Sequence, residues 1–358
     1  MIRSTARQFL TDRIPMEKVR ELMMSDDGFE RVLWKEMADL GWTGLSIAEQ
    51  HGGAGLGQVE LTVLVEEMGR MVTPGPFFAS AVLATTALQE TASDTQQAEL
   101  LPALASGEMI ATLAVFEQPR GWSWDTPATS ARDDEGSWSL SGAKRGVLDG
   151  HLADRILVTA TVDDGLGLFL VDGEADGLSI TQESALDPTR RQASLVLQDV
   201  PATRIGDGDV TAGLQRALRL AVIALSAEQV GGAQACMEMS VEYAKTRFQF
   251  GRPIGSYQSI KHRCANMLMK VEHARSASYY AARVGHDDPE LAVAAPLAST
   301  VASEAYVWVA GENIQIHGGI GFTWEHDAHI YLKRAKTSSL LLGSPHHQRD
   351  LLGRAIGI

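Results

Sequence analysis

The spacing of apolar residues changes twice along this 358-residue chain. From the N-terminus to about residue 110, and again from about residue 209 onward, apolar residues recur every three or four positions, which is typical of helices with one buried face. Between these parts the apolar residues form short runs or alternate with polar ones, which is typical of short strands. The sequence therefore predicts an α+β fold with an N-terminal α-helical domain (1–110), a small antiparallel β-sheet or barrel domain (111–208) and a C-terminal four-helix bundle (209–358).

Composition and charge exclude several classes of protein. The chain is 45% hydrophobic and 21% charged with a net charge of -14, which is typical of a soluble globular protein and disfavours binding to nucleic acid or a membrane surface. Its only cysteines, Cys236 and Cys264, lack metal-site spacing, so we expect neither a disulfide framework nor a metal site. No apolar run is expected to reach membrane-spanning length, and the first residues lack the apolar core of a signal peptide. These features predict a cytoplasmic protein.

Two segments of the C-terminal part are more specific. They are RFQFGRPIGSYQ (247–258) and QIHGGIGFT (315–323), in this order and separated by a predicted pair of long helices. Together they resemble the acyl-CoA dehydrogenase family, and the likeness covers almost the whole chain. The resemblance implies an FAD-dependent oxidoreductase that removes two hydrogens from the Cα–Cβ bond of an acyl-CoA thioester and passes electrons to an electron-transferring flavoprotein. It also implies a dimer or tetramer, because FAD in this family is shared between subunits.

The resemblance places FAD contacts on residues of these two segments. Chemistry agrees with it, because a guanidinium at a helix end can pair with a pyrophosphate, and a glycine lets backbone approach a ligand closely. Taken one at a time, the arginine is as well explained as a solvated helix-end cation and the glycines as a helix cap. The joint spacing favours cofactor contacts, and the predicted residues are Arg247, Phe250, Gln258, Gln315, Gly318 and Gly319.

The family's catalytic base is missing from the matching positions. The resemblance places the usual glutamate at Leu342, and the alternative position on the first bundle helix at Ala221. Neither side chain can accept a proton, so the identity of the base stays unknown. His346 and His347 lie nearby, but adjacent residues on a helix point about 100° apart, which disfavours joint action on one metal or substrate atom. A helix restart is predicted there instead, with Ser344 as its cap.

Other charged residues of the predicted bundle are expected to have structural roles or to face solvent. Glu228 and Glu238 lie about two helical turns or more from the alternative base position, so we expect surface or interhelical roles for both. The cations Lys333, Arg334 and Lys336 are expected on a solvated helix face.

The predicted β domain also departs from the family pattern. The segment from Phe116 to Asp125 and the segment Gly146-Val147-Leu148 stand where the family usually contacts flavin from its own chain. The own-chain contacts are therefore weakened, whereas those expected to reach a neighbouring subunit's FAD are kept.

Three hypotheses for function stay open. The chain is either an acyl-CoA dehydrogenase with an unrecognised base, a catalytically deficient partner of a homologous catalytic subunit whose FAD site it completes, or a non-redox CoA-binding scaffold. The resemblance extends to actinobacterial-type heteromers acting in fatty-acid or steroid side-chain β-oxidation, and the missing base favours the heteromer.

Overall fold

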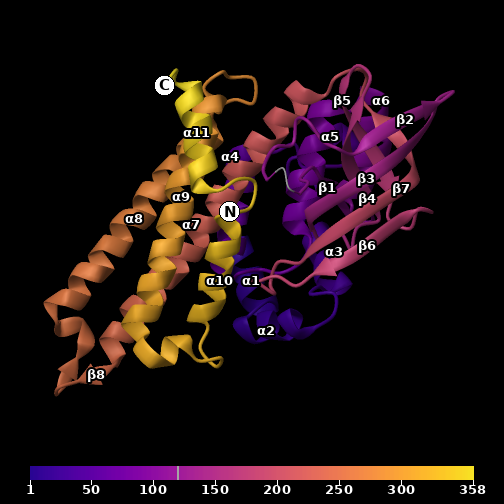
Figure 1. Ribbon diagram of the computed structural model, residues 1–358. Helices are drawn as coiled ribbons and strands as arrows, with labels where there is room; N and C mark the ends of the chain where they lie inside the picture. Colours follow the sequence, from indigo (N-terminus) through magenta and orange to yellow (C-terminus); the bar gives the residue numbers. More distant parts are fainter. Residues whose placement is uncertain (119–120) are drawn as a thin grey trace. The chain divides into compact units, whose positions relative to one another are not determined.

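The computed structural model describes residues 1–118 and 121–358, and the chain divides into two compact units (Figure 1). The bundle unit comprises Met1–Glu21, Gln58–Thr73 and Val222–Ile358. The sheet unit comprises Leu22–Gly57 and Pro74–Ala221. The division into three domains at residues 110 and 208 stays a prediction.

The sheet unit begins with short helices. They include α3 (Arg31–Asp39), η1 (Glu49–His51), the π-helix η2 (Phe78–Ala84), α5 (Thr85–Thr91) and α6 (Asp94–Ala105), while α2 (Met16–Met24) has residues in both units.

One detail of the helical pattern was wrong in α3. The spacing predicts one apolar face that includes Val32 and Leu40, yet both are exposed, and Trp34 is buried instead. The Trp34 indole N–H donates to the carbonyl of Gly107, so its burial depends on a segment more than 70 residues away in sequence, which local periodicity does not reveal.

The strands of the sheet unit form one seven-stranded sheet. Its strands are β1 (Ala111–Ala114), β2 (Ser130–Asp134), β3 (Ser137–Leu148), β4 (Arg155–Val162), β5 (Gly165–Asp172), β6 (Leu178–Glu183) and β7 (Gln192–Ile205). Most pairings are antiparallel, although β1 and β2 each pair with β4 in parallel. Because β4 pairs with both β2 and β5, the order β4-β2-β3-β7-β5 closes into a ring, as a small barrel does. Its core contains Leu140, Ile156, Val158, Phe169 and Leu195.

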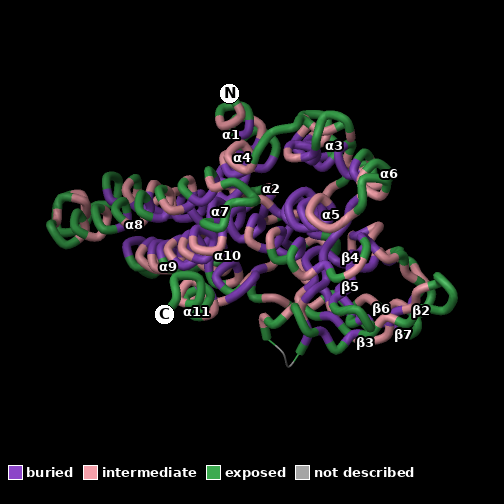
Figure 2. Tube along the Cα trace, turned by 90° about the horizontal axis from the view of Figure 1, so that it is seen from above, coloured by how far each residue is buried: buried purple, intermediate pink, exposed green. Residues whose placement is uncertain are grey.

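Long helices form the bundle unit. Its elements are α1 (Ile2–Arg13), α4 (Gln58–Arg70), α7 (Thr211–Thr246, from Val222 onward), the strand pair β8 (Phe248–Gln249) and β9 (Arg252–Pro253), η3 (Ile254–Ser256), α8 (Gln258–Arg283), α9 (Leu291–His317), η4 (Gly318–Phe322), α10 (Ala328–Ser338) and α11 (Pro345–Ala355). The predicted helices of the C-terminal part are all present, and the predicted end of α9 at Gly318 is confirmed. Figure 2 shows α7 as a mostly buried tube, whereas α8 has exposed and partly buried residues along its length.

Glycines let two of these helices pack with their backbones in contact. A Cβ on Gly69 of α4 would lie 2.0 Å from the carbonyl oxygen of Glu228 on α7. Reciprocally, a Cβ on Gly231 of α7 would lie 1.8 Å from the carbonyl oxygen of Glu66 on α4. Any side chain at either position would separate α4 from α7.

Two helical stretches are longer and more apolar than the sequence interpretation allowed. Thr211–Thr246 and Leu291–Phe322 reach the length and hydropathy of a membrane-crossing helix, so the expectation that no apolar run would do so was wrong. In their most apolar windows, 89% and 61% of the residues are buried inside the protein. Such burial is what the core helix of a bundle shows, because its apolar residues face neighbouring helices.

Candidate functional site

The six predicted cofactor residues lie on three connected parts of the bundle. They occupy the segment after α7, the start of α8, and the end of α9 with η4 (Figure 1). The aromatic ring of Tyr243 on α7 lies 4.3 Å from the imidazole of His317 on α9, which places these helix ends together. All six residues are exposed. We call this group, Arg247, Phe250, Gln258, Gln315, Gly318 and Gly319, the exposed bundle end.

Arg247 is fixed through its backbone and available through its side chain. Its amide donates to the carbonyl of Tyr243 at 2.8 Å, and its carbonyl accepts from Ile254 at 2.8 Å. Within residues 1–118 and 121–358, its guanidinium forms no hydrogen bond or ion pair. An exposed guanidinium on an ordered backbone can bind an anionic group from outside the chain.

Large apolar side chains are exposed on two connections of the bundle, the one from α7 to α8, which contains Arg247, and the one from α9 to α10. Phe250, at the tip of the β8–β9 turn, has a positive φ of 52° and is 92% exposed. Further exposed apolar residues of these connections are Phe248, Ile320, Phe322 and Trp324. Exposed apolar groups of this size are typical of a surface that binds another molecule.

After α9, the backbone of Gly318 has an unusual conformation, and both Gly318 and Gly319 have open space beside them. Gly318 adopts φ 63° and ψ -141°, a conformation almost restricted to glycine. A Cβ added to Gly318 or Gly319 would meet no atom of the described chain within 4 Å. The space over both glycines is therefore open to a ligand, which fits the predicted cofactor contact.

The two positions of the missing base are apolar and buried. Leu342 is 8% exposed and has a positive φ of 59°, which is strained for leucine. The turn is held from α11, because the Gln348 side-chain amide donates to the Leu342 carbonyl at 2.8 Å. Ala221 is completely buried. Neither position supplies a carboxylate, and the turn at Leu342 is ordered without one.

The neighbouring histidines begin a helix, as the sequence predicts. Ser344 is the N-cap of α11 and its hydroxyl accepts from the backbone N–H of His347 at 3.2 Å, while Pro345 is in the first turn. His346 is exposed, whereas burial lowers the pKa of His347. Among the described residues no group of three or more His, Cys, Asp or Glu is placed to hold a metal ion. Cys236 and Cys264 are free thiols.

Glu228 and Glu238 have the interhelical roles that the sequence interpretation allowed. Glu228 accepts from Arg334 of α10 at 3.2 Å, and Glu238 pairs with Arg70 of α4. The prediction of a solvated face for Lys333, Arg334 and Lys336 was wrong for Arg334, which is only 2% exposed. Arg334 is buried because it pairs with Glu228, which lies 106 residues earlier in the chain. Local sequence spacing does not reveal such a distant partner.

A buried ion pair in the sheet unit was missed by sequence reasoning. The ammonium of Lys144 lies 2.7 Å from the Glu117 carboxylate and 3.0 Å from the Thr159 hydroxyl, and Lys144 is completely buried. Burial lowers the pKa of Lys144 to about 8. Burial opposes ionisation of Glu117, but hydrogen bonds from Lys144, Thr129 and Ala128 outweigh it and lower the pKa of this carboxyl to about 2.

This ion pair anchors the segments that depart from the family pattern. Glu117 is the second residue of the segment from Phe116 to Asp125, and Lys144 lies two residues before Gly146 in β3. Pro119 and Arg120 of the first segment lie outside the described residues. The one available signal was a lysine in a strand otherwise rich in small and apolar residues, which does not identify a partner by itself.

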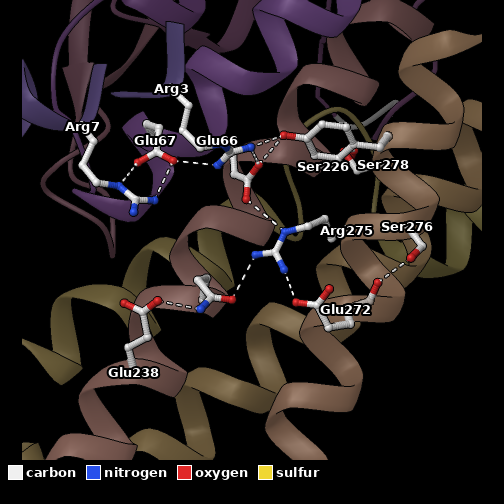
Figure 3. A network of polar contacts seen from close by, with 12 residues as sticks. Arg3, Arg7, Glu66, Glu67, Ser226, Glu238, Glu272, Arg275, Ser276 and Ser278 are labelled. Atoms are coloured by element: carbon white, nitrogen blue, oxygen red, sulfur yellow. Dashed lines mark hydrogen bonds and ion pairs between the residues drawn. The ribbon is translucent and has the colours of Figure 1, made fainter. Parts of the chain in front are cut away.

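A charged hollow of about 280 Å³ lies among α1, α4, α7 and α8. Figure 3 shows the polar contacts between side chains of these helices. Arg3 donates to Glu66 at 2.8 Å and to Glu67 at 2.7 Å, and Glu66 also accepts from Tyr279 and Arg275. The hollow is lined by four arginines and four glutamates, namely Arg3, Arg7, Arg70, Arg275, Glu66, Glu67, Glu238 and Glu272. Because the four positive and four negative charges balance, these side chains connect the helices by ion pairs and leave no net charge to attract a charged ligand.

Comparison with known proteins identifies the family. Family models described as acyl-CoA dehydrogenase, N-terminal domain, and acyl-CoA dehydrogenase, C-terminal domain, match residues 1–108 and 212–357. The acyl-CoA dehydrogenase IpdE2 of Mycobacterium tuberculosis is 34% identical over 359 residues, covering 99% of this chain and 95% of the relative.

Solved structures agree in fold over nearly the whole chain. A variant of the Tcur3481-Tcur3483 steroid ACAD is 34% identical with a TM-score of 0.90, covering 99% of this chain and 96% of the other. The ChsE4-ChsE5 complex from Mycobacterium tuberculosis is 28% identical with a TM-score of 0.91 and the same coverage. An FAD-dependent dehydrogenase is 26% identical with a TM-score of 0.89, covering 99% of this chain and 96% of the other. The predicted fold and resemblance are thus confirmed, and the chain belongs to the acyl-CoA dehydrogenase family of oxidoreductases.

Proposed function

We propose that this chain is a subunit of an FAD-dependent acyl-CoA dehydrogenase, and that it completes an FAD site whose catalytic base is supplied by a homologous partner subunit. The observation that carries the proposal is the pair of buried apolar residues, Leu342 and Ala221, at the two base positions. Removal of the α-proton of a thioester needs a proton acceptor within hydrogen-bond reach, and neither residue is one.

The exposed bundle end supports a role in completing an FAD site that is held mainly by another subunit. Arg247 is ordered through its backbone but has no internal ion partner among the described residues, and open space lies over Gly318 and Gly319. These features fit a pyrophosphate held mainly by another chain. Two similar structures support a two-component assembly, because they are named as Tcur3481-Tcur3483 and as the ChsE4-ChsE5 complex.

FAD, when bound, supplies the flavin that accepts a hydride from the substrate. In this proposal Arg247 binds the pyrophosphate, Phe250 and Gln258 supply the adenine-side and second-helix contacts, and Gln315, Gly318 and Gly319 line the same cofactor. The substrate is an acyl-CoA thioester of fatty-acid or steroid side-chain β-oxidation, and an electron-transferring flavoprotein is the electron acceptor. We place the assembly, a dimer or tetramer, in the cytoplasm.

Arg247→Ala should weaken FAD binding by the assembled enzyme about 10- to 100-fold, because a charge-assisted hydrogen bond contributes about 1.5–3 kcal/mol. The dissociation constant is measured by flavin fluorescence on the complex co-purified with its homologous subunit. The matched control is Arg283→Ala, which removes an exposed guanidinium from the last residue of α8 and should leave FAD affinity unchanged. Equal affinity of the Arg247→Ala complex and the unaltered complex would contradict the assigned role.

A further inference from the structure

The turn between α9 and α10 contains Gly318 and Gly319 of the exposed bundle end. It runs from Gly318 to Asp327 and includes the exposed side chains of Ile320, Phe322 and Trp324. Besides the bonds inside η4, its backbone bonds include Thr323 donating to Ile320 at 3.0 Å and His326 donating to Thr323 at 3.3 Å. Such a turn needs side chains from elsewhere to fix its conformation.

His326 connects this turn to the start of α10. Its Nδ1 accepts a hydrogen bond from the backbone N–H of Ala328, the first residue of the helix, at 3.1 Å. First-turn N–H groups have no partner within their own helix, and the N-cap residue Asp327 makes no side-chain capping bond. Because Nδ1 acts as an acceptor, it carries no proton in this arrangement.

The same imidazole packs on a second histidine. The ring centroids of His326 and His317 are 4.4 Å apart, and His317 in turn packs on Tyr243. His317 is buried, and its Nδ1 lies 2.8 Å from the Asn313 carbonyl, to which it donates. The stack therefore joins the turn to α9 and α7, and two imidazolium rings at this separation would repel each other.

The charged groups around His326 include two cations, Arg20 and Lys333, and two carboxylates, Asp327 and Glu325. Arg20 of α2 donates to Asp327 at 2.6 Å and to the Trp324 carbonyl at 2.7 Å, so the nearest carboxylate is already paired. Lys333 of α10 lies over the Trp324 ring. Further titratable groups here, among the described residues, are the hydroxyl of Tyr243, the exposed Glu325 and His329, whose ring stacks on Trp324 and whose Nε2 donates to the Trp324 carbonyl at 3.2 Å.

Electrostatics favours the neutral form of both stacked histidines. Burial lowers the pKa of His326 and outweighs the opposing effect of Asp327, while Arg20 adds a smaller lowering effect. Burial likewise lowers the pKa of His317, with His326 adding to the effect against the Asn313 bond. A positive charge at the N-terminus of α10 would also oppose the helix dipole.

We propose that His326 is a positioning residue: its neutral imidazole holds the turn from Gly318 to Asp327 in place for the partner subunit and its FAD, and protonation of this imidazole releases the turn. The partner's part in this inference rests on the proposed function. The geometry of the turn does not, because the cap and the stack lie within this chain.

The expected pH dependence of the turn follows from the lowered pKa of His326 in the held conformation. Above the ordinary histidine pKa, about 6.5, His326 is neutral whether the turn is held or released, so the cap is intact. Below that value the released turn takes up a proton more readily than the held turn, because the pKa of the held state is lower. The held conformation is therefore progressively lost as the pH falls from about 6.5 toward the lowered pKa.

The test is hydrogen–deuterium exchange of the peptide covering residues 314–330 in the full chain, corrected for intrinsic exchange. Protection should fall about tenfold between pH of about 7.5 and about 5.5 in the unaltered protein. In His326→Asn the amide oxygen can accept the same bond but cannot be protonated, so protection should stay constant. The control His346→Asn, at an exposed histidine of α11, should behave like the unaltered protein.

Constant protection in the unaltered chain, or an equal loss in His326→Asn, would overturn the inference without touching the proposed function. A second arm measures binding of the homologous subunit at both pH values. Acid should weaken binding to the unaltered chain and spare His326→Asn. If acid lowers the protection of the turn but leaves binding of the homologous subunit unchanged, His326 holds the turn without any effect on the partner subunit.

Discussion

Glu117→Ala should lower the free energy of unfolding of the sheet unit by about 3–5 kcal/mol at neutral pH, because it leaves a buried ammonium without its counter-ion. Lys144 has no exposed surface, and among the described residues its remaining polar neighbour at hydrogen-bond distance is the Thr159 hydroxyl. Loss of the carboxylate also removes acceptors from the Thr129 hydroxyl at 2.6 Å and the Ala128 amide at 2.5 Å. Urea denaturation followed by circular dichroism measures the loss.

A surface ion pair of the same unit is the matched control. Asp164 accepts from Arg204 at 3.0 Å, and the Asp164 side chain is 52% exposed, whereas that of Arg204 is 20% exposed. Asp164→Ala should cost less than about 1 kcal/mol, since solvent screens the half-exposed carboxylate. Similar losses for both variants would contradict the buried pair's role.

Acid should remove the difference between the unaltered protein and Glu117→Ala. The pKa of Glu117 is lowered from 4.5 to about 2, so its stabilising effect is complete above the unfolded value. As the pH falls below that value and toward the lowered one, the unfolded chain takes up the proton first, and the contribution of Glu117 is lost. A gap between the two proteins that stays constant through this range would be inconsistent with an ionised Glu117.

Arg334→Ala should destabilise the bundle unit by a similar amount, about 3–5 kcal/mol, because it removes a buried cation beside a buried carboxylate. Arg334 donates to Glu228 at 3.2 Å and to the Thr73 carbonyl at 3.3 Å, so one side chain joins α10 to α7 and to the segment after α4. Thermal and urea unfolding of the purified chain measure the effect.

Two further variants isolate the charge effect from the loss of packing. Lys336→Ala removes an exposed cation two residues along the same helix and should change stability by less than about 0.5 kcal/mol. The double change Arg334→Met with Glu228→Leu removes both charges and should recover much of the loss, because two apolar side chains need no counter-ion. A double variant as unstable as Arg334→Ala would mean that packing, not charge, dominates there.

The sequence predicted the elements that depend on local pattern. The end of α9 at Gly318 and the start of α11 at Ser344 and Pro345 follow from capping rules that act within a few residues. The change from helical to strand periodicity likewise identified the sheet, although the closing contact between β2 and β4 joins residues 31 positions apart and has no local sign.

Features that depend on distant partners were not predicted. Arg334 and Lys144 are buried because Glu228 and Glu117 face them across the fold. The Arg3–Glu66 contact joins residues 63 positions apart. For the candidate site, the family resemblance supplied six residues, and the structure adds that all six are exposed. The histidine stack behind them is defined by ring positions, which sequence spacing does not give.

The most direct test of the shared-site account is flavin content and flavin bleaching. The chain is purified alone and after co-expression with a homologous subunit that has the active-site glutamate, and each sample is titrated with acyl-CoA thioesters under anaerobic conditions. The account predicts that the isolated chain holds little FAD and shows no bleaching, whereas the co-expressed complex holds FAD that the substrate bleaches. Stoichiometric FAD with acyl-CoA-dependent bleaching in the isolated chain would contradict the account, and acyl-CoA binding without flavin in either sample would identify a non-redox scaffold instead.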